Sequence, residues 1–230
     1  NEPINGFDPL GWCTATVTAG GDSVSSEYDC NVPPWPRTQP APLGSITDYD
    51  DTHSNPRKES ALAFRAALNS FKRAAKTIAK KTNFKKDCVE DFSKLGVTAA
   101  QVQDDAAHVQ FLDAVGNTTP MSSLYASSPV PSVRQAGNSA SGTVGSFIAS
   151  HAGTVAVAQL GKPFVYLNAS LIDPGAYFQN LAIVLHEVLH NVTGLTDSDL
   201  PRLLGLPSQD ENGRAVPTDN VTKRLLGDCF

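Results

Sequence analysis

The spacing of hydrophobic residues predicts a long amphipathic helix over residues 57–81. Apolar side chains recur there at three- and four-residue steps, at Leu62 or Phe64 and then at Leu68, Phe71, Ala75 and Ile78. The lysines and arginines of the same stretch fall mostly on the opposite side and continue to Lys86. We interpret this basic face as a solvated helix face, and a partner-binding patch is the alternative.

Residues 87–168 show a more broken pattern. Helical spacing continues over residues 87–115, with Gly96 ending a first helix and Thr98 capping a second. Residues 116–142 are rich in Ser, Gly, Asn and Pro, which predicts a long irregular segment. Residues 154–168 read TVAVAQLGKPFVYLN and predict a hairpin of two short strands with its turn at Gly161.

A second, strongly apolar helix is predicted after Pro174. The stretch AYFQNLAIVLHEVLHNVT is apolar almost all the way round a helix, which places the helix in the core. It stops at Gly194, and a new helix starts near Asp197 or Ser198. A last short helix is predicted over residues 220–230.

The first 55 residues differ in character from the rest. Residues 12–28 alternate small or apolar with polar side chains around a GGD turn, which predicts two short strands. Residues 31–44, NVPPWPRTQPAPLG, are too rich in proline for a helix or a central strand. We interpret them as an extended linker.

Composition and charge exclude some classes of function. With 40% hydrophobic residues and a formal net charge of −5, the chain is typical of a globular protein, and nucleic acid or an anionic membrane is not expected as its main partner. No apolar run is long enough to span a bilayer. The chain starts at Asn1 without a basic and apolar leader, so we expect it to be a piece of a longer protein.

Four cysteines are spread over the chain without a CxxC pair, so a zinc knuckle is not expected. Cys13 and Cys30 flank a short segment, and Cys88 and Cys229 are placed to join the tail to the first helical unit. Free buried thiols are the alternative, since four cysteines allow three pairings.

The stretch HEVLH carries the clearest chemical signal. Residues four apart lie on one face of a helix, so His186 and His190 present their imidazoles to one point. Glu187 projects about 100° away, where its carboxylate can act on water without being a ligand. Burying these three groups is costly without a partner, and a metal ion serves all three. We therefore predict a Zn²⁺ site with Glu187 as the catalytic base.

A third ligand is expected just after the helix. Gly194 lets the chain reverse, and Asp197 is our first choice, with Asp199 as the alternative. One aspartate can bind the metal while the other only caps the next helix. Glu211 and His151 are more remote candidates.

The motif HEVLHNVTGLTD resembles that of the zincin metallopeptidases, in particular the classes whose third ligand is aspartate. Gly194 lies one residue later than in the metzincin pattern, and the only methionine, Met121, lies upstream of the motif. The resemblance implies a small sheet above the active-site helix, with KPFVYLN as the edge strand that binds an extended substrate. It also implies that the helix over residues 57–81 backs the fold.

The expected reaction is peptide hydrolysis with water activated by the metal and by Glu187. Tyr166, Tyr177 and His151 are candidates by type for stabilising the oxyanion. Two other classes compete with this function. One is a non-catalytic binding module in which metal staples the helix to the following loop. The other is a surface or adhesion tail in which the histidines are incidental.

A second resemblance lies at the start of the chain. NEPINGFDPLGW, residues 1–12, resembles the segment that closes the shell of RHS (YD-repeat) proteins before their variable C-terminal domain. The resemblance implies a secreted, delivered or cell-surface bacterial effector of toxin type. Its partners would be a peptide or protein substrate, the RHS shell and an immunity protein, without nucleic acid or a membrane span.

Together these observations predict an α+β fold of zincin type. It is mostly helical, with a small antiparallel sheet or hairpin packed on the active-site helix. Residues 1–12 are the end of the RHS core, residues 13–55 hold the short strands and the linker, and residues 56–230 form the metallopeptidase domain.

Overall fold

The computed structural model describes residues 56–151, 153–207 and 217–230. The strands predicted in residues 12–28, the proline-rich linker, the pairing of Cys13 with Cys30, and Glu211 lie outside the described residues. The described part is α+β and mostly helical. Its elements, in chain order, are α1 (Pro56–Ala79), α2 (Lys86–Lys94), α3 (Ala99–His108), β1 (Gln110–Asp113), α4 (Met121–Tyr125), α5 (Pro131–Gly137), α6 (Val144–Ser150), β2 (Ala156–Ala158), β3 (Phe164–Leu167), the 3-10 turn η1 (Ala169–Leu171), α7 (Tyr177–Thr193), α8 (Asp199–Leu204) and α9 (Pro217–Cys229).

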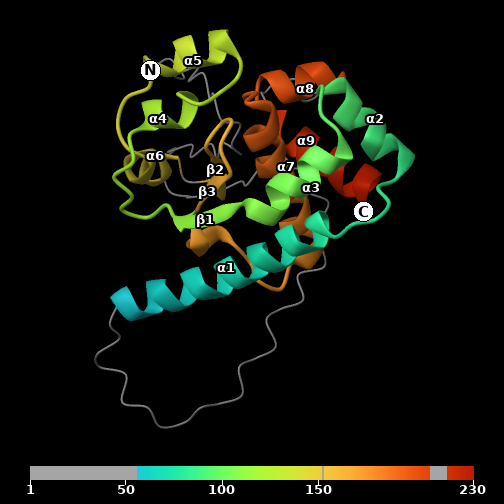
Figure 1. Cartoon of the computed structure of the whole chain (residues 1–230). Helices are drawn as coiled ribbons and strands as arrows, with labels where there is room; N and C mark the ends of the chain where they lie inside the picture. The colour runs from blue at the N-terminus through green and yellow to red at the C-terminus, as the bar shows by residue number, and fades with distance from the viewer. Residues whose placement is uncertain (1–55, 152, 208–216) are drawn as a thin grey trace, which may run out of the picture.

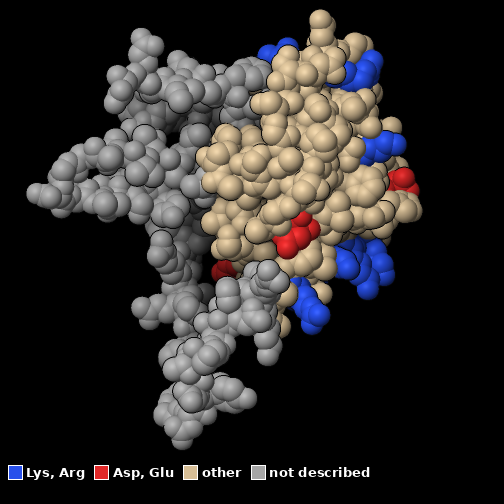
Figure 2. Space-filling view, turned by 90° about the vertical axis from the view of Figure 1, so that its left-hand side faces the viewer, with Lys and Arg blue, Asp and Glu red and all other residues tan. Residues whose placement is uncertain are grey.

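The helices surround α7 and a small sheet. Figure 1 shows α1 along the lower edge, α4, α5 and α6 together on one side of the sheet, and α2, α8 and α9 gathered on the other side of the molecule. None of the described helices is long and apolar enough to cross a membrane. On the face in Figure 2 the described surface is mostly uncharged, and its Lys, Arg, Asp and Glu side chains are scattered.

The sheet has the strand order β1-β3-β2 and is mixed, not antiparallel throughout. β2 pairs antiparallel with β3, which confirms the hairpin predicted around Gly161. β1 pairs in parallel with β3, with Gln110 opposite Phe164. The segment KPFVYLN therefore contains the central strand, not the edge strand expected from the zincin resemblance. Because both sides of β3 are paired, only β1 and β2 are edge strands within the described sheet.

Residues 110–113 form β1, so the prediction of continued helix there was wrong. Gln110 donates its backbone N–H to the carbonyl of Pro163, 2.8 Å away. Phe111 is buried and packs edge-on against Phe71 of α1, with ring centroids 5.7 Å apart. Pairing with a strand far along the chain and packing under α1 override the local helical spacing.

The segment 116–142 was predicted to be irregular, but it contains α4 and α5. Met121 and Leu124 of α4 and Val133 of α5 are buried in a second apolar cluster, which is centred on one face of the sheet. Pro131 occupies the first turn of α5, where its missing N–H costs nothing. Helices this short form through packing, and sequence periodicity does not reveal them.

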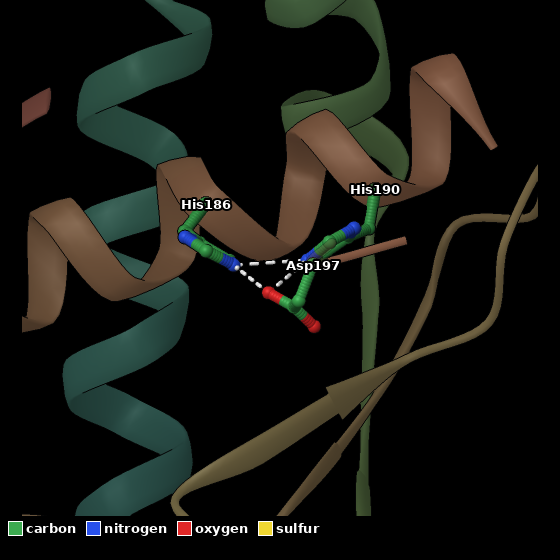
Figure 3. A group of neighbouring side chains, drawn as sticks. All are labelled: His186, His190 and Asp197. Atoms are coloured by element: carbon green, nitrogen blue, oxygen red, sulfur yellow. Dashed lines mark hydrogen bonds and ion pairs between the residues drawn. The ribbon is translucent and has the colours of Figure 1, made fainter. Parts of the chain in front are cut away.

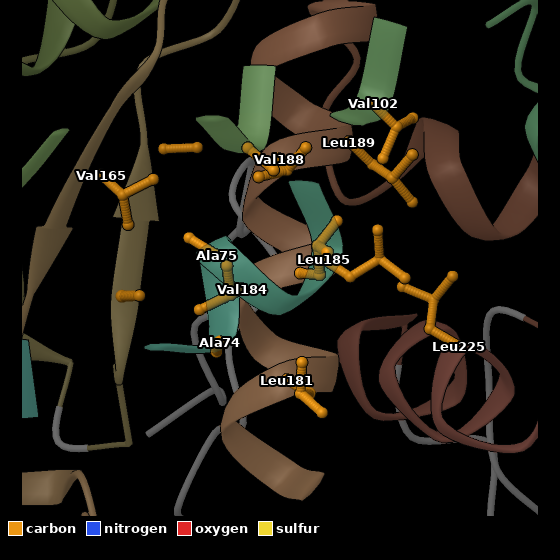
Figure 4. Packing of buried hydrophobic residues seen from close by; sticks show 14 of the residues in the cluster. Ala74, Ala75, Val102, Val165, Leu181, Val184, Leu185, Val188, Leu189 and Leu225 are labelled. Carbon is orange, nitrogen blue, oxygen red and sulfur yellow. The ribbon is translucent and has the colours of Figure 1, made fainter. Parts of the chain in front are cut away.

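The main core lies around α7. Leu181, Val184, Leu185, Val188 and Leu189 are fully or almost fully buried and pack against α1, α3 and α9, as Figure 4 shows. The prediction of a core helix that stops at Gly194 is therefore confirmed.

The predicted face of α1 is confirmed at every position except Leu62, since Phe64 and Leu68 are half-buried and pack against the core. Phe71, Ala75 and Ile78 are buried, and α1 packs against α7, as expected of a backing helix. Leu62, by contrast, is 56% exposed. Of the two alternatives that the sequence left open, Phe64 and not Leu62 therefore faces the core.

Gly96 and Thr98 act as predicted in the link from α2 to α3. Gly96 follows α2 with φ +74°, a conformation that glycine adopts without strain. Thr98 and Gln101 form a reciprocal capping box at the start of α3. These signals are local, which is why the sequence reveals them.

A disulfide joins Cys88 of α2 to Cys229 at the end of α9, which is one of the pairings that the sequence left open. Both cysteines are fully buried. Beside them, the buried Asp91 accepts hydrogen bonds from Arg224 of α9, with Nη2 to Oδ1 at 2.8 Å. Since α9 also packs on α7, these links hold the C-terminal helix against the core.

Candidate metal centre

α7 brings two imidazoles together on one face. His186 and His190 are one helical turn apart, and their Nε2 atoms lie 2.9 Å from each other (Figure 3). Both side chains are almost fully buried. The helix therefore aims the same ring nitrogen of each histidine at a common point.

The turn after α7 delivers a carboxylate to this point. Gly194 caps the helix with φ +67°, and its N–H donates to the carbonyl of His190 at 2.8 Å. The chain then reverses, and Oδ1 of Asp197 lies 2.8 Å from Nε2 of His186 and 3.0 Å from Nε2 of His190 (Figure 3). Asp197 is completely buried.

The three converging atoms have the character of metal ligands. Nδ1 of His190 donates to the carbonyl of Leu195 at 2.7 Å, so a neutral His190 presents the lone pair of Nε2 to Asp197 and His186. Lone pairs that converge on a buried carboxylate repel one another unless a cation lies between them. His186, His190 and Asp197 thus form a buried group that could hold a metal ion.

The spacing of the group agrees with a small ion. Around a tetrahedral zinc with bonds of about 2.0–2.1 Å, neighbouring ligand atoms are roughly 3.3 Å apart. The three ligand atoms here are separated by 2.8, 2.9 and 3.0 Å. The three atoms would therefore have to move apart by about 0.3–0.5 Å to surround such an ion. Oδ2 of Asp197 and Nδ1 of His186 are buried without a hydrogen-bond partner in the described part of the chain.

The electrostatics of the group are strongly coupled. Burial lowers the pKa of His186. Burial also disfavours the charged form of His190, but the carboxylate of Asp197 outweighs it and raises the pKa of His190 to about 9. The pKa of Asp197 is held below its usual range, because both histidines more than offset its burial. Without a metal ion, His190 is therefore protonated at neutral pH, and its positive charge balances the carboxylate of Asp197.

Glu187 follows the first histidine and is also buried. Burial raises the pKa of its carboxyl group to about 8, and the positive charge of His190 and a backbone hydrogen bond with Ala158 act in the opposite direction. Ala158 belongs to β2, so the edge of the sheet lies next to this carboxylate. A carboxyl group with such a pKa can both take up and release a proton near neutral pH.

Asp199 does not reach the histidines. Its Oδ2 accepts from the hydroxyl of Thr196 at 2.8 Å, and its Oδ1 accepts from Arg202 at 2.9 Å. It therefore stabilises the start of α8, and of the two aspartates that the sequence left open the structure brings Asp197 to the metal group.

The other predicted residues lie apart from the group. The hydroxyl of Tyr177 is 2.9 Å from that of Thr77 on α1. Tyr166 is buried in the second apolar cluster, and the ring of His151 stacks on Phe147. None of the three has a described contact with His186, His190 or Asp197.

Sequence reasoning missed the residues that hold the metal group and the turn at Gly194 in position. Besides the carbonyl of Leu195, the buried hydroxyl of Ser128 donates to the carbonyl of Gly194 at 2.7 Å. A Cβ on Gly194 would lie 2.2 Å from Cδ of Pro129. One signal in the sequence pointed to Ser128 and Pro129: they lie in residues 116–142, and long irregular segments of this kind are often functional.

No family model matches the chain, and neither do the curated proteins or solved structures with which it was compared.

Proposed function

We propose that the chain is a zinc-dependent metallopeptidase that hydrolyses peptide bonds. The observation that carries this proposal is the convergence of two imidazole nitrogens and one carboxylate oxygen within 3.0 Å, with Glu187 next to the first histidine on the same helix. Two nitrogen ligands and one oxygen ligand are a donor set that suits catalytic zinc. His186, His190 and Asp197 would hold the ion.

Zinc bound in this position supplies a Lewis acid that acidifies water and polarises a carbonyl group. The residues of the chain do the rest. The carboxylate of Glu187 takes a proton from the attacking water and later gives it to the nitrogen of the leaving amine. His190 is kept in the required tautomer by the carbonyl of Leu195.

The sheet edge nearest Glu187 is β2, whose three residues are each at most 2% exposed. β2 is an edge strand, and its Ala158 hydrogen bonds with Glu187. A peptide strand that added to this edge would be held by backbone hydrogen bonds next to the base, and the buried edge would have to be uncovered first. Under this proposal a substrate would pair with β2, and not with the central strand in KPFVYLN.

The segment NEPINGFDPLGW supports a further proposal, that this domain is the C-terminal effector of an RHS repeat protein. As such it would be secreted, delivered or held at a cell surface, and its partners would include the RHS shell and an immunity protein. The disulfide between Cys88 and Cys229 is in keeping with an oxidising compartment.

The burial of the site favours a second candidate function. His186, His190 and Asp197 are each at most 2% exposed, as in structural zinc sites that are closed to substrate. Under this alternative the metal staples α7 to the loop before α8, in a binding module without catalysis.

One pair of measurements separates the two functions. Zinc per chain is determined by elemental mass spectrometry, and cleavage of a proteome-derived peptide library is followed by mass spectrometry. We expect about one zinc per chain, and we expect Glu187→Gln to keep the zinc while cleavage falls by about 10²–10⁴-fold, because only the base is lost. If the parent chain binds zinc but cleaves no peptide, the result would support the alternative, in which the metal has only a structural role. An active Glu187→Gln chain would overturn the proposed mechanism.

A further inference from the structure

A basic hollow lies at the C-terminal end of α1, away from the metal ligands. It has a volume of about 530 Å³ and is lined by four cationic side chains and no acidic one. The four cations are Arg73, Lys76, Lys80 and Lys81. Thr82 and Asn83 at its rim add a hydroxyl and an amide donor. The hollow is therefore a concentration of positive charge on a chain whose formal net charge is −5.

The cations of the hollow are regularly placed. Arg73, Lys76 and Lys80 are three and four residues apart, so they share one face of α1 and extend over roughly 10 Å along it. None of the four forms an ion pair with a residue that the structure describes. Like charges that line one hollow repel one another, and an anion bound there would offset this repulsion.

Two of the four cations are held in place by aromatic rings. The guanidinium of Arg73 lies over the ring of Tyr177, 5.4 Å from its centroid. The ammonium of Lys81 lies 5.7 Å from the ring centroid of Phe84 and 5.4 Å from that of Phe230. Such contacts restrict long side chains before any ligand arrives, which lowers the entropic cost of binding.

The dipole of α1 explains only part of this arrangement. Cations in the last turn of a helix are favoured by the partial negative charge there, which accounts for Lys76 and its neighbours. It does not account for the shallow, open hollow, or for the contacts of Arg73 and Lys81 with aromatic rings. These features indicate a binding site.

We propose that the basic hollow binds a small soluble molecule that carries two or more phosphate groups. Arg and Lys with hydroxyl and amide donors are the usual partners of phosphate oxygens. The volume falls within the roughly 300–1,000 Å³ of small-molecule sites. A nucleic acid strand fits less well, because the rings of Tyr177, Phe84 and Phe230 are occupied by cations and do not offer free stacking surfaces.

Isothermal titration calorimetry on the full chain tests the proposal at about 0.15 M salt, where weak surface attraction is screened. The probe is fructose 1,6-bisphosphate, with inorganic phosphate for comparison. The double variant Lys76→Gln with Lys80→Gln removes two cations of the hollow. The matched control, Lys72→Gln with Lys86→Gln, removes two exposed lysines outside it. Thermal unfolding shows that each variant is folded.

We expect one bisphosphate per chain, bound at least about tenfold more tightly than inorganic phosphate because two phosphate groups meet separate cations. The hollow variant should bind the bisphosphate at least about tenfold more weakly, and the control should stay within about twofold. No saturable binding, or an equal loss in both variants, would overturn the proposal. Binding to vesicles with phosphatidylinositol 4,5-bisphosphate but not to the soluble probe would also overturn it and assign the hollow to a lipid headgroup.

Discussion

His190 holds Asp197 and Leu195 at opposite edges of one imidazole ring. Its Nε2 lies 3.0 Å from the carboxylate of Asp197, and its Nδ1 donates to the carbonyl of Leu195 at 2.7 Å. All three residues lie within residues 190–197, where α7 ends and the chain reverses at Gly194. The glycine turn therefore positions both the carboxylate of the candidate metal group and the carbonyl that sets the tautomer of His190.

Asp197 and Asp199 should respond differently to the same substitution. Asp197→Asn removes the charge from a ligand, so we expect a larger loss of zinc affinity than the roughly 10–100-fold that a supporting residue costs. Asp199→Asn should keep about one zinc per chain and cost about 0.5–2 kcal/mol of stability, because it weakens the contacts of Asp199 with Thr196 and Arg202. Zinc analysis and thermal unfolding of both variants measure this. Loss of zinc in Asp199→Asn alone would exclude Asp197 as the ligand.

Zinc binding should release protons at neutral pH. The metal-free site holds a proton on His190, whose pKa of about 9 lies above its unfolded value near 6.5, and this proton must leave before the metal binds. Zinc affinity should therefore rise with pH up to about 9. Calorimetry in two buffers of different ionisation enthalpy counts the protons released, and identical heats in both would contradict the prediction.

The stability of the metal-free chain should fall as the pH rises, both through His190 and through Glu187, whose pKa is raised to about 8. A folded pKa above the unfolded one means that His190 contributes its full stabilisation below pH 6.5 and loses it as the pH rises through about 9. The zinc-loaded chain lacks this titration, because zinc replaces the proton. Thermal unfolding between pH 6 and 9, with and without zinc, checks the difference.

Gly194→Ala should disrupt the site through its backbone. The residue has φ +67°, which costs an L-residue about 1–2 kcal/mol, and its new Cβ would lie 2.2 Å from Pro129. We expect a loss above about 2 kcal/mol in unfolding free energy, together with weaker zinc binding. Gly205→Ala is the matched control, since Gly205 has φ +70° but open space around it. Equal losses in the two variants would mean that the contact with Pro129 is unimportant.

Loss of the disulfide should destabilise the whole domain. The double variant Cys88→Ser with Cys229→Ser opens a loop between residues 141 positions apart, and we expect a loss of about 3–5 kcal/mol. Chemical denaturation of the variant and of the parent, each with and without reductant, measures it. Reductant should lower the stability of the parent alone. A parent that is insensitive to reductant under unfolding conditions would indicate free thiols.

Local patterns in the sequence determined much of the fold. The apolar face of α1, the core position of α7, the stops at Gly96 and Gly194, the cap at Thr98 and the hairpin around Gly161 all follow from spacing of a few residues. The placement of His186 and His190 on one face is of the same kind. Helical periodicity and turn chemistry act between near neighbours, and a sequence displays them directly.

The tertiary structure alone decided which distant segments meet. It paired residues 110–113 in parallel with β3, folded α4 and α5 within a segment of turn-forming residues, and made β2 the edge strand beside Glu187. It also turned Asp197 inward and Asp199 toward Thr196, although both aspartates follow Gly194 at similar distances. These outcomes depend on packing and pairing between segments that are far apart in the chain. The spacing of near neighbours in the sequence does not reveal such contacts.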